Sequence, residues 1–289
     1  MKPFKLSTFE KFVIYRKKAI DISLYVFLII SYFIIDICKH YINKPIAYVI
    51  LITFVLICTI YNEIMPTLKN AKITKAHENL DMDYALDGIN KLIDAVNPKD
   101  TERASNYRNN KIAFLMDAGK YREAEEEIKT FFQIFDAKRL SPDALFTVHL
   151  NLAQLKTLNG NEDDYKSQKS IVEGYYDKVK KSKLKNLIGY ADHCFNGLVN
   201  SETAFHGDYD EGFEQQVLDH IKFFGGEEVK KIPSLDYLNA YFTLFTYFNR
   251  LGNTEKADYY ARKVTEIGNS GYQYYRIAKE YLENADRSN

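Results

Sequence analysis

The chain has 289 residues, of which 46% are hydrophobic and 27% charged, an ordinary globular composition that excludes wholesale disorder or a collagen-like fibre. Lys and Arg number 39, as do Asp and Glu, so the balanced charge does not indicate a nucleic-acid partner. Thirteen glycines and six prolines are few for this length, which favours long helices over a turn-rich all-β fold. We therefore expect an all-α protein.

The first 18 residues form a basic segment, with six Lys or Arg side chains against one Glu. Residues 22–35 follow without a charge, and this stretch lengthens to roughly 20 residues, as a spanning helix needs, if Asp21 and Asp36 lie near the interfaces. Residues 45–62 are 18 further residues without a charge. We predict a two-helix transmembrane hairpin over residues 19–65, with spans at about 19–38 and 45–64. A secretory signal peptide is disfavoured because no small-residue cleavage site follows the first stretch.

The basic residues predict the orientation of the hairpin. The flank after the second span carries Lys69, Lys72 and Lys75, whereas the loop between the spans offers only Lys39 and Lys44. Positively charged flanks stay on the cytosolic side of a membrane. We expect a multi-pass protein of the cell membrane with its N-terminus and residues 66–289 in the cytosol. The three cysteines, without CxxC spacing, agree with a reducing compartment.

From about residue 66 onward, apolar residues recur at helical spacing. Turns centred on Gly119, Gly160, Gly207 and Gly252 separate the expected helices and lie 41, 47 and 45 residues apart. A helix–turn–helix unit that returns at a nearly constant period is typical of an α-solenoid, in which each pair buries its apolar face against its neighbours. We expect residues 66–289 to contain about four to five helix pairs.

Two of these units share a set of positions around the turn. They are Leu115, Gly119, Tyr121, Ala124, Ile128 and Phe131 in residues 110–132, and Phe245, Phe248, Gly252, Ala257 and Ala261 in residues 241–264. This pattern resembles a tetratricopeptide (TPR) repeat, in which a glycine ends the first helix and a small residue lets the two helices approach. A degenerate first unit has Leu80 in place of the glycine. The units exceed the usual ~34 residues and the chain has no Trp, so another family of α–α repeats is the alternative.

The resemblance implies a binding surface. In TPR arrays the first helix of each pair lines a concave groove, and the inward positions here carry mostly neutral, amide-bearing side chains. These positions are Asn106, Asn109, Met116, Gln154, Thr157, Ser201, Asn239, Phe242, Asn249 and Arg250. Asn side chains pair with both the N–H and the C=O of an extended peptide. We therefore expect these residues to contact a protein or peptide partner; a solvated inner surface without a ligand is the alternative.

A second candidate surface is the basic run of Lys178, Lys180, Lys181, Lys183 and Lys185. Beside a bilayer, such lysines contact anionic headgroups at about 1 kcal/mol each. A nucleic-acid partner is disfavoured because the part of the chain after residue 65 has a net negative charge. A solvated helix end is the alternative interpretation.

The sequence contains no P-loop, GxGxxG, GxSxG, HExxH or paired CxxC motif, so we expect no enzyme, no metal and no cofactor. The expected function is a membrane-anchored adaptor or scaffold that holds a protein or peptide partner at the cytosolic membrane face. The alternative is an immunity or stress-protection protein whose hairpin is the working part. Two spans alone do not enclose a transport path, so a homo-oligomer is compatible with the sequence. Its Lys-, Asn-, Ile- and Tyr-rich usage indicates an AT-rich bacterial genome.

Overall fold

The computed structural model describes residues 4–37, 44–158, 162–181, 185–224 and 226–288. The expected all-α fold is confirmed, since the only strands in the described residues form a two-stranded antiparallel ribbon. The elements are α1 (Thr8–Ile37), α2 (Lys44–Glu78), α3 (Met82–Ala95), α4 (Thr101–Asp117), α5 (Tyr121–Ile134), η1 (Ala137–Arg139), α6 (Pro142–Leu158), α7 (Glu162–Lys180), α8 (Lys185–His206), α9 (Phe213–His220), β1 (Phe223–Phe224), β2 (Glu227–Glu228), α10 (Ser234–Arg250), α11 (Thr254–Ile267) and α12 (Gln273–Ser288).

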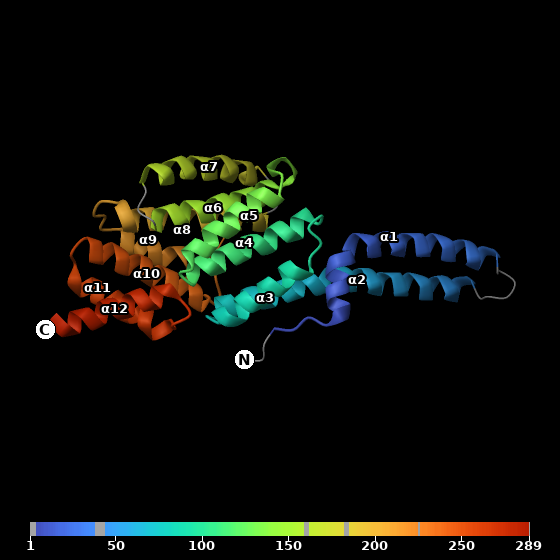
Figure 1. Cartoon of the computed structure of the whole chain (residues 1–289), viewed down its shortest axis with the longest axis horizontal. Coiled ribbons are helices and arrows are strands. Elements are labelled where there is room, and N and C mark those ends of the chain that lie inside the picture. Colours follow the sequence, from blue (N-terminus) through green and yellow to red (C-terminus); the bar gives the residue numbers. More distant parts are fainter. Residues whose placement is uncertain (1–3, 38–43, 159–161, 182–184, 225, 289) are drawn as a thin grey trace.

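Helices α1 and α2 pack side by side as a hairpin that projects from the other helices (Figure 1). Large apolar side chains are exposed along both of them, for example Tyr25 at 72% and Ile50 at 64%. Among the described helices, α2 alone is long and apolar enough to cross a membrane, and the apolar part of α1, Ile22–Asp36, is shorter. Membrane crossing by either span and the orientation of the hairpin stay predictions.

Helix α2 changes surroundings along its length. Its first half is exposed, whereas Met65, Ile73 and His77 in its second half are buried against the other helices. Pro66 lies inside the helix without ending it. The hairpin is therefore joined to the remaining helices through one continuous helix, with no loop between them.

The N-terminal segment packs against the base of the hairpin. Phe4, Val13 and Ile14 are buried in the main core, and the ring of Phe4 meets the edge of Tyr84 with 5.7 Å between centroids. Lys91 Nζ donates a hydrogen bond of 2.8 Å to the carbonyl oxygen of Phe4. Residues 1–18, expected only as a basic flank, therefore also supply core residues.

Helix α1 begins with reciprocal capping bonds and is broken after two turns. The Ser7 N–H donates to Glu10 Oε2 at 2.8 Å, and the Glu10 N–H donates to Ser7 Oγ at 3.2 Å, the arrangement of a capping box. Glu10 also lies 2.8 Å from Lys69 of α2. At Arg16 the backbone leaves the helical range (φ −102°, ψ 17°), so the first turns of α1 run across the base of the hairpin (Figure 1).

Helices α2, α4 and α10 end in the same turn. In each, one residue adopts a left-handed backbone: Leu80 (φ 63°), Gly119 (φ 70°) and Gly252 (φ 74°). Its N–H bonds to the carbonyl three residues back, and the next N–H bonds to the carbonyl five residues back, which is a Schellman motif. Gly207 does not share this conformation, and Gly160 lies outside the described residues. A sequence position without glycine thus forms the same turn, with Leu80 bearing a strain of about 1–2 kcal/mol.

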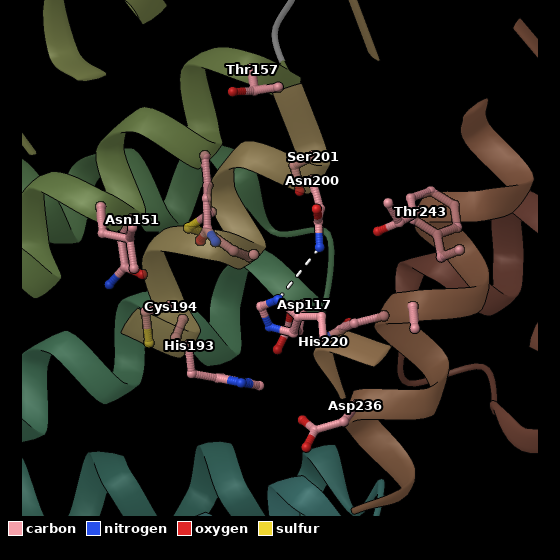
Figure 2. Close-up of a pocket in the computed structure, with 18 of the residues that line it drawn as sticks. Asp117, Asn151, Thr157, His193, Cys194, Asn200, Ser201, His220, Asp236 and Thr243 are labelled. Atoms are coloured by element: carbon pink, nitrogen blue, oxygen red, sulfur yellow. Dashed lines mark hydrogen bonds between the residues drawn. The ribbon is translucent and has the colours of Figure 1, made fainter. Parts of the chain in front are cut away.

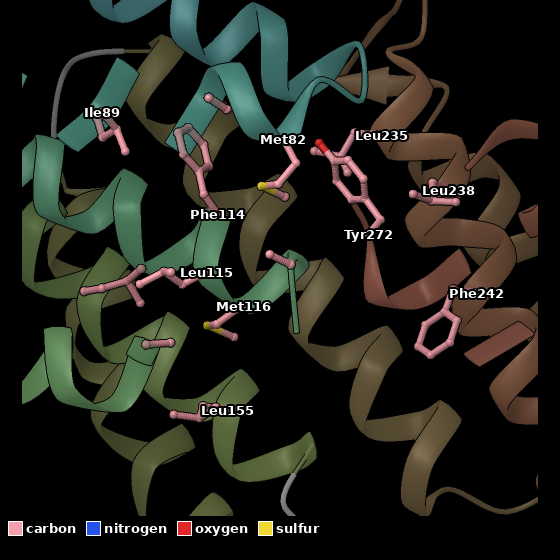
Figure 3. Packing of buried hydrophobic residues seen from close by; sticks show 14 of the residues in the cluster. Met82, Ile89, Phe114, Leu115, Met116, Leu155, Leu235, Leu238, Phe242 and Tyr272 are labelled. Carbon is pink, nitrogen blue, oxygen red and sulfur yellow. The ribbon is translucent and has the colours of Figure 1, made fainter. Parts of the chain in front are cut away.

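The start of α12 packs back onto the ends of α2 and α4. Tyr272 Oη donates to the carbonyl of His77 at 2.8 Å, and Arg276 Nη2 donates to the carbonyl of Ala118 at 2.8 Å. Figure 3 shows Tyr272 beside Met82 in the shared core. The last helices therefore close against the first ones, and the helices do not form an open row.

Most buried side chains belong to one core, and a smaller core lies between α6, α7 and α8. Ala124 and Ala257, the small residues of the two clearest sequence units, are fully buried as expected. The TPR assignment itself stays a prediction.

Candidate ligand-binding cavity

A cavity of about 300 Å³ lies between helices α4, α6, α8 and α10, with further walls from α9 and α12 (Figure 2). This volume is at the lower end of the range for small-ligand pockets. Each helix contributes positions three or four residues apart, such as Asn151, Gln154 and Thr157 on α6 and His193, Gly197 and Ser201 on α8. These spacings place the side chains of each helix on one face, so a single stripe of each lines the cavity.

The walls are rich in amides that also hold neighbouring helices together. Asn109 Nδ2 of α4 donates to the carbonyl of Ala144 at 3.1 Å, and Asn151 Nδ2 of α6 donates to the carbonyl of Asn109 at 3.4 Å. Gln216 Nε2 of α9 donates to Asn200 Oδ1 of α8 at 2.9 Å. The amides therefore fix the relative positions of α4, α6, α8 and α9 around the cavity.

Two histidines face each other in the cavity wall. The rings of His193 and His220 have centroids 4.5 Å apart, and the Asn200 amide lies 3.5 Å from His220 Nδ1 (Figure 2). Burial lowers the pKa of His193, and burial together with His193 lowers the pKa of His220 to about 4. Both imidazoles are therefore neutral near neutral pH. In the part of the chain that the structure describes, no group of three or more His, Cys, Asp or Glu has the arrangement of a metal site.

Cys194 follows His193 on α8 and is partly accessible (Figure 2). Burial raises the pKa of its thiol to about 12, so the group stays protonated at neutral pH. A protonated thiol is a poor nucleophile and a poor metal ligand. The arrangement therefore gives Cys194 no evident catalytic role.

The carboxylates of the cavity differ in their partners. Asp117 at the end of α4 accepts a hydrogen bond of 2.7 Å from Tyr274 and lies 2.8 Å from His77 Nε2. The carboxylate of Asp236, in the first turn of α10, has no hydrogen bond or ion pair to another described residue, although His77 interacts with it at longer range. Burial raises the pKa of Asp236 to about 6. Its charged form is thus insufficiently stabilised by the protein alone.

The structure brings most of the expected groove positions together and separates three of them. The positions that line the cavity are Asn109, Met116, Gln154, Thr157, Ser201, Asn239 and Phe242. Asn106 is exposed outside the cavity, and Asn249 lies in a second hollow beside α12. Arg250 donates to the carbonyls of Ala204 and Gly207, so its side chain fastens α10 to the end of α8.

The basic run lies at the end of α7 and the start of α8. Lys178 lies over the ring of Tyr175 at 4.6 Å, and Lys180 interacts with Tyr176 Oη at 3.4 Å and with Asp192 at 3.6 Å. Lys181 is exposed at the end of α7. Lys183 lies outside the described residues, and Lys185 is the first residue of α8. Lys178 and Lys180 are therefore engaged with neighbouring aromatic rings as well as exposed to solvent.

The expected site residues included neither Asp236 nor the two histidines of the cavity wall. A usable signal was present, because Asp236 lies three residues before Asn239 and therefore on the same face of α10. Comparisons with family models, curated proteins and solved structures found no match for the chain.

Proposed function

We propose that this chain is a membrane-anchored adaptor that holds a protein or peptide partner at the cytosolic membrane face. The observation that carries the proposal is the amide-lined cavity between α4, α6, α8 and α10. Its polar lining contains buried atoms without partners, such as Asn109 Oδ1, which a bound partner satisfies. The shared turns after α2, α4 and α10 support the TPR-like arrangement of helix pairs.

The exposed hairpin supports membrane attachment. Side chains as apolar as those of α1 and α2 are rarely exposed together in a soluble protein, and a bilayer is the natural environment for them. At the base of the hairpin Phe9, Phe12 and Tyr15 are exposed, and Phe9 lies against Tyr61 with 5.8 Å between ring centroids. Aromatic side chains favour the level of the lipid headgroups. In this proposal the first turns of α1 lie in the interface while the hairpin enters the bilayer.

The closure by α12 sets the kind of contact that a partner makes. Tyr274 of α12 lines the cavity and bonds to Asp117, so the cavity is bounded by the last helix as well as by the first helices of the pairs. A cavity of about 300 Å³ accommodates a chain end or one inserted side chain. The proposed partner therefore inserts a short polar element, in contrast to the long extended segment that an open groove holds.

Gly197 provides a direct test. It lies on α8 in the cavity wall, and a Cβ atom built there meets no atom within 4 Å. Gly197→Leu therefore fills the cavity without a clash at the backbone. Gly174→Leu, at an exposed position of α7, is the matched control, because a Cβ there also meets nothing within 4 Å and the helix gains the same propensity.

The experiment is crosslinking in intact membranes followed by recovery of the full-length chain. We expect the same partner to be recovered with the wild type and with Gly174→Leu, and to be lost with Gly197→Leu. Recovery of that partner with all three proteins rejects the cavity as the binding site. Melting curves of both variants must show no loss of stability, which separates blocking from unfolding.

A second candidate is an immunity or stress-protection function in which the hairpin is the working part. The aromatic and aliphatic side chains exposed on both hairpin helices favour it. Because Phe4, Val13 and Ile14 belong to the core, the test must keep residues 1–18 and replace only residues 19–62 by a short Gly/Ser linker. Partner recovery that survives this replacement supports the adaptor. If the linker replacement abolishes protection of cells and Gly197→Leu leaves that protection intact, the second candidate is supported.

A further inference from the structure

The cavity presents hydrogen-bond acceptors that have no donor. Asn109 is 3% exposed and uses its Nδ2 on the carbonyl of Ala144, so the unpartnered atom is its side-chain oxygen. The side-chain oxygen of Asn239 on α10 is also buried without a partner. A buried polar atom without a partner costs about 1–3 kcal/mol, so a ligand that donates to these oxygens gains that free energy on binding.

Asp236 adds a charge to this set of acceptors. It lies three residues before Asn239, so the two side chains are neighbours on one face of α10. Asp117 already accepts a hydrogen bond from Tyr274 and lies 2.8 Å from His77 Nε2, whereas no ion pair or hydrogen bond joins the Asp236 carboxylate to another described residue. A bound cation with N–H groups would supply both the ion pair and the hydrogen bonds that the carboxylate lacks.

The surrounding charges have the same sign. Among the described residues that line the cavity, the acidic ones are Asp117 and Asp236, and none is Lys or Arg. Glu78 interacts electrostatically with Asp236 from the end of α2, and Lys75 and His77 are its other electrostatic neighbours. An anionic ligand meets two carboxylates here without a permanent cation. A cation meets them with no competing Lys or Arg in the cavity wall.

We infer that the group which binds in this cavity is a protonated amine, held by the Asp236 carboxylate, with the side-chain oxygens of Asn239 and Asn109 as further acceptors. An ammonium group has three N–H donors and no acceptor, which complements a wall of unpartnered oxygens. The inference rests on the proposed function, in which the amine is a Lys side chain or the amino terminus of the partner. A free organic amine has the same chemistry.

The test uses the full-length protein in detergent and titration calorimetry with defined compounds. The compounds are the blocked tripeptide N-acetyl-Ala-Lys-Ala-amide, its norleucine counterpart, and n-butylammonium. Norleucine has the shape of lysine without its charge. The variants are Asp236→Asn and the control Asp83→Asn, which removes an exposed carboxylate from the first turn of α3.

We expect the lysine peptide to bind at least roughly tenfold more tightly than the norleucine peptide, because charge-assisted hydrogen bonds are the stronger ones. Asp236→Asn removes this preference and Asp83→Asn preserves it. Equal affinity for the two peptides, or a preference for lysine that Asp236→Asn retains, overturns the inference.

If both peptides bind equally and Gly197→Leu blocks them, the proposed function survives that failure. If only n-butylammonium binds, and does so through Asp236, the amine inference holds and the peptide partner is rejected. If none of the three compounds binds, the inference is overturned.

Discussion

The carboxylate of Asp236 is disfavoured by its surroundings, so its ionisation should cost folding free energy. Its pKa is raised from 3.8 to about 6, which means that the folded protein binds this proton more tightly than the unfolded chain does. The free energy of unfolding therefore falls as the pH rises from about 4 to 6, and the full cost is present above that window. Since one pKa unit corresponds to about 1.4 kcal/mol, and partial exposure reduces the effect, we expect a cost of up to about 2 kcal/mol.

Asp236→Asn should thus stabilise the unliganded protein above pH 6, with the gain vanishing below about pH 4. Thermal denaturation of the full chain at both ends of this range measures the difference. Asp83→Asn should show no comparable gain. A loss of stability in Asp236→Asn at high pH would mean that the carboxylate makes favourable contacts in the folded protein.

His220 should give the opposite pH dependence. Its pKa is lowered from 6.5 to about 4, so the unfolded chain binds the proton more readily than the folded protein does. The stabilisation is present above the unfolded pKa and is lost as the pH falls from about 6.5 to 4. His220→Phe cannot be protonated, and its loss of stability at pH 5 should be smaller by roughly 1–2 kcal/mol. His206→Phe, at the exposed end of α8, is the control, and an unchanged acid transition in His220→Phe would contradict the prediction.

At the scale of the elements, the turns after α4 and α10 separate backbone strain from packing. Gly119 and Gly252 share a left-handed backbone, but only Gly119 faces α12, where an added Cβ lies 2.8 Å from Gln273 Cβ. Gly252→Ala should cost about 1 kcal/mol for the backbone alone. Gly119→Ala should cost more, because overpacking adds roughly 1–3 kcal/mol. Melting curves of the two variants measure their loss of stability. An equal loss in both would show that α12 moves aside without a free-energy cost.

The helix crossings give a second prediction at this scale. Ala124 and Ala257 are fully buried where their helices pack against neighbours, so Leu at either position should cost on the order of 1–3 kcal/mol. The measurement needs the full chain, because Phe4 and Ile14 also belong to the core. Ala71→Leu, on an exposed face of α2, is the control. If both core variants melt at the wild-type temperature, the helices are not closely packed at these two positions.

The sequence predicted the features that depend on local backbone preference. Gly119 and Gly252 marked their turns correctly because a left-handed helix end favours glycine. Leu80 was placed at an equivalent position although its strain is visible only in the structure. The helical period predicted which side of α10 carries Asn239, but not that Asp236 on the same side is buried, since burial depends on α2 and its neighbours.

At the scale of the whole molecule, the closure of the helices was not predictable from a repeat pattern. It depends on side-chain contacts such as Tyr272 Oη to the carbonyl of His77, two residues that are 195 positions apart in the chain. No periodic signal marks such a contact. The sequence pattern of an open array therefore led to an expected groove, and the structure has a bounded cavity.

The topology prediction also belongs to the whole molecule. The basic flanks and the weakly charged loop predict that both termini lie in the cytosol. Reporter fusions at residue 42 and at the C-terminus should therefore report opposite sides of the membrane. A C-terminal fusion that reports the exterior would contradict the cytosolic adaptor.

The continuity of α2 has a mechanical consequence for the proposed anchor. A helix rises about 1.5 Å per residue, so the 14 residues after Ile64 extend it by roughly 20 Å into the packed helices. Because no flexible tether separates the two regions, anchoring of the hairpin in a bilayer, as proposed, would fix both the height and the orientation of the cavity relative to the membrane. Any change in the tilt of the hairpin would then rotate the cavity by the same angle. A partner anchored in the same bilayer can then be selected by how far it stands above the membrane, in addition to its chemistry.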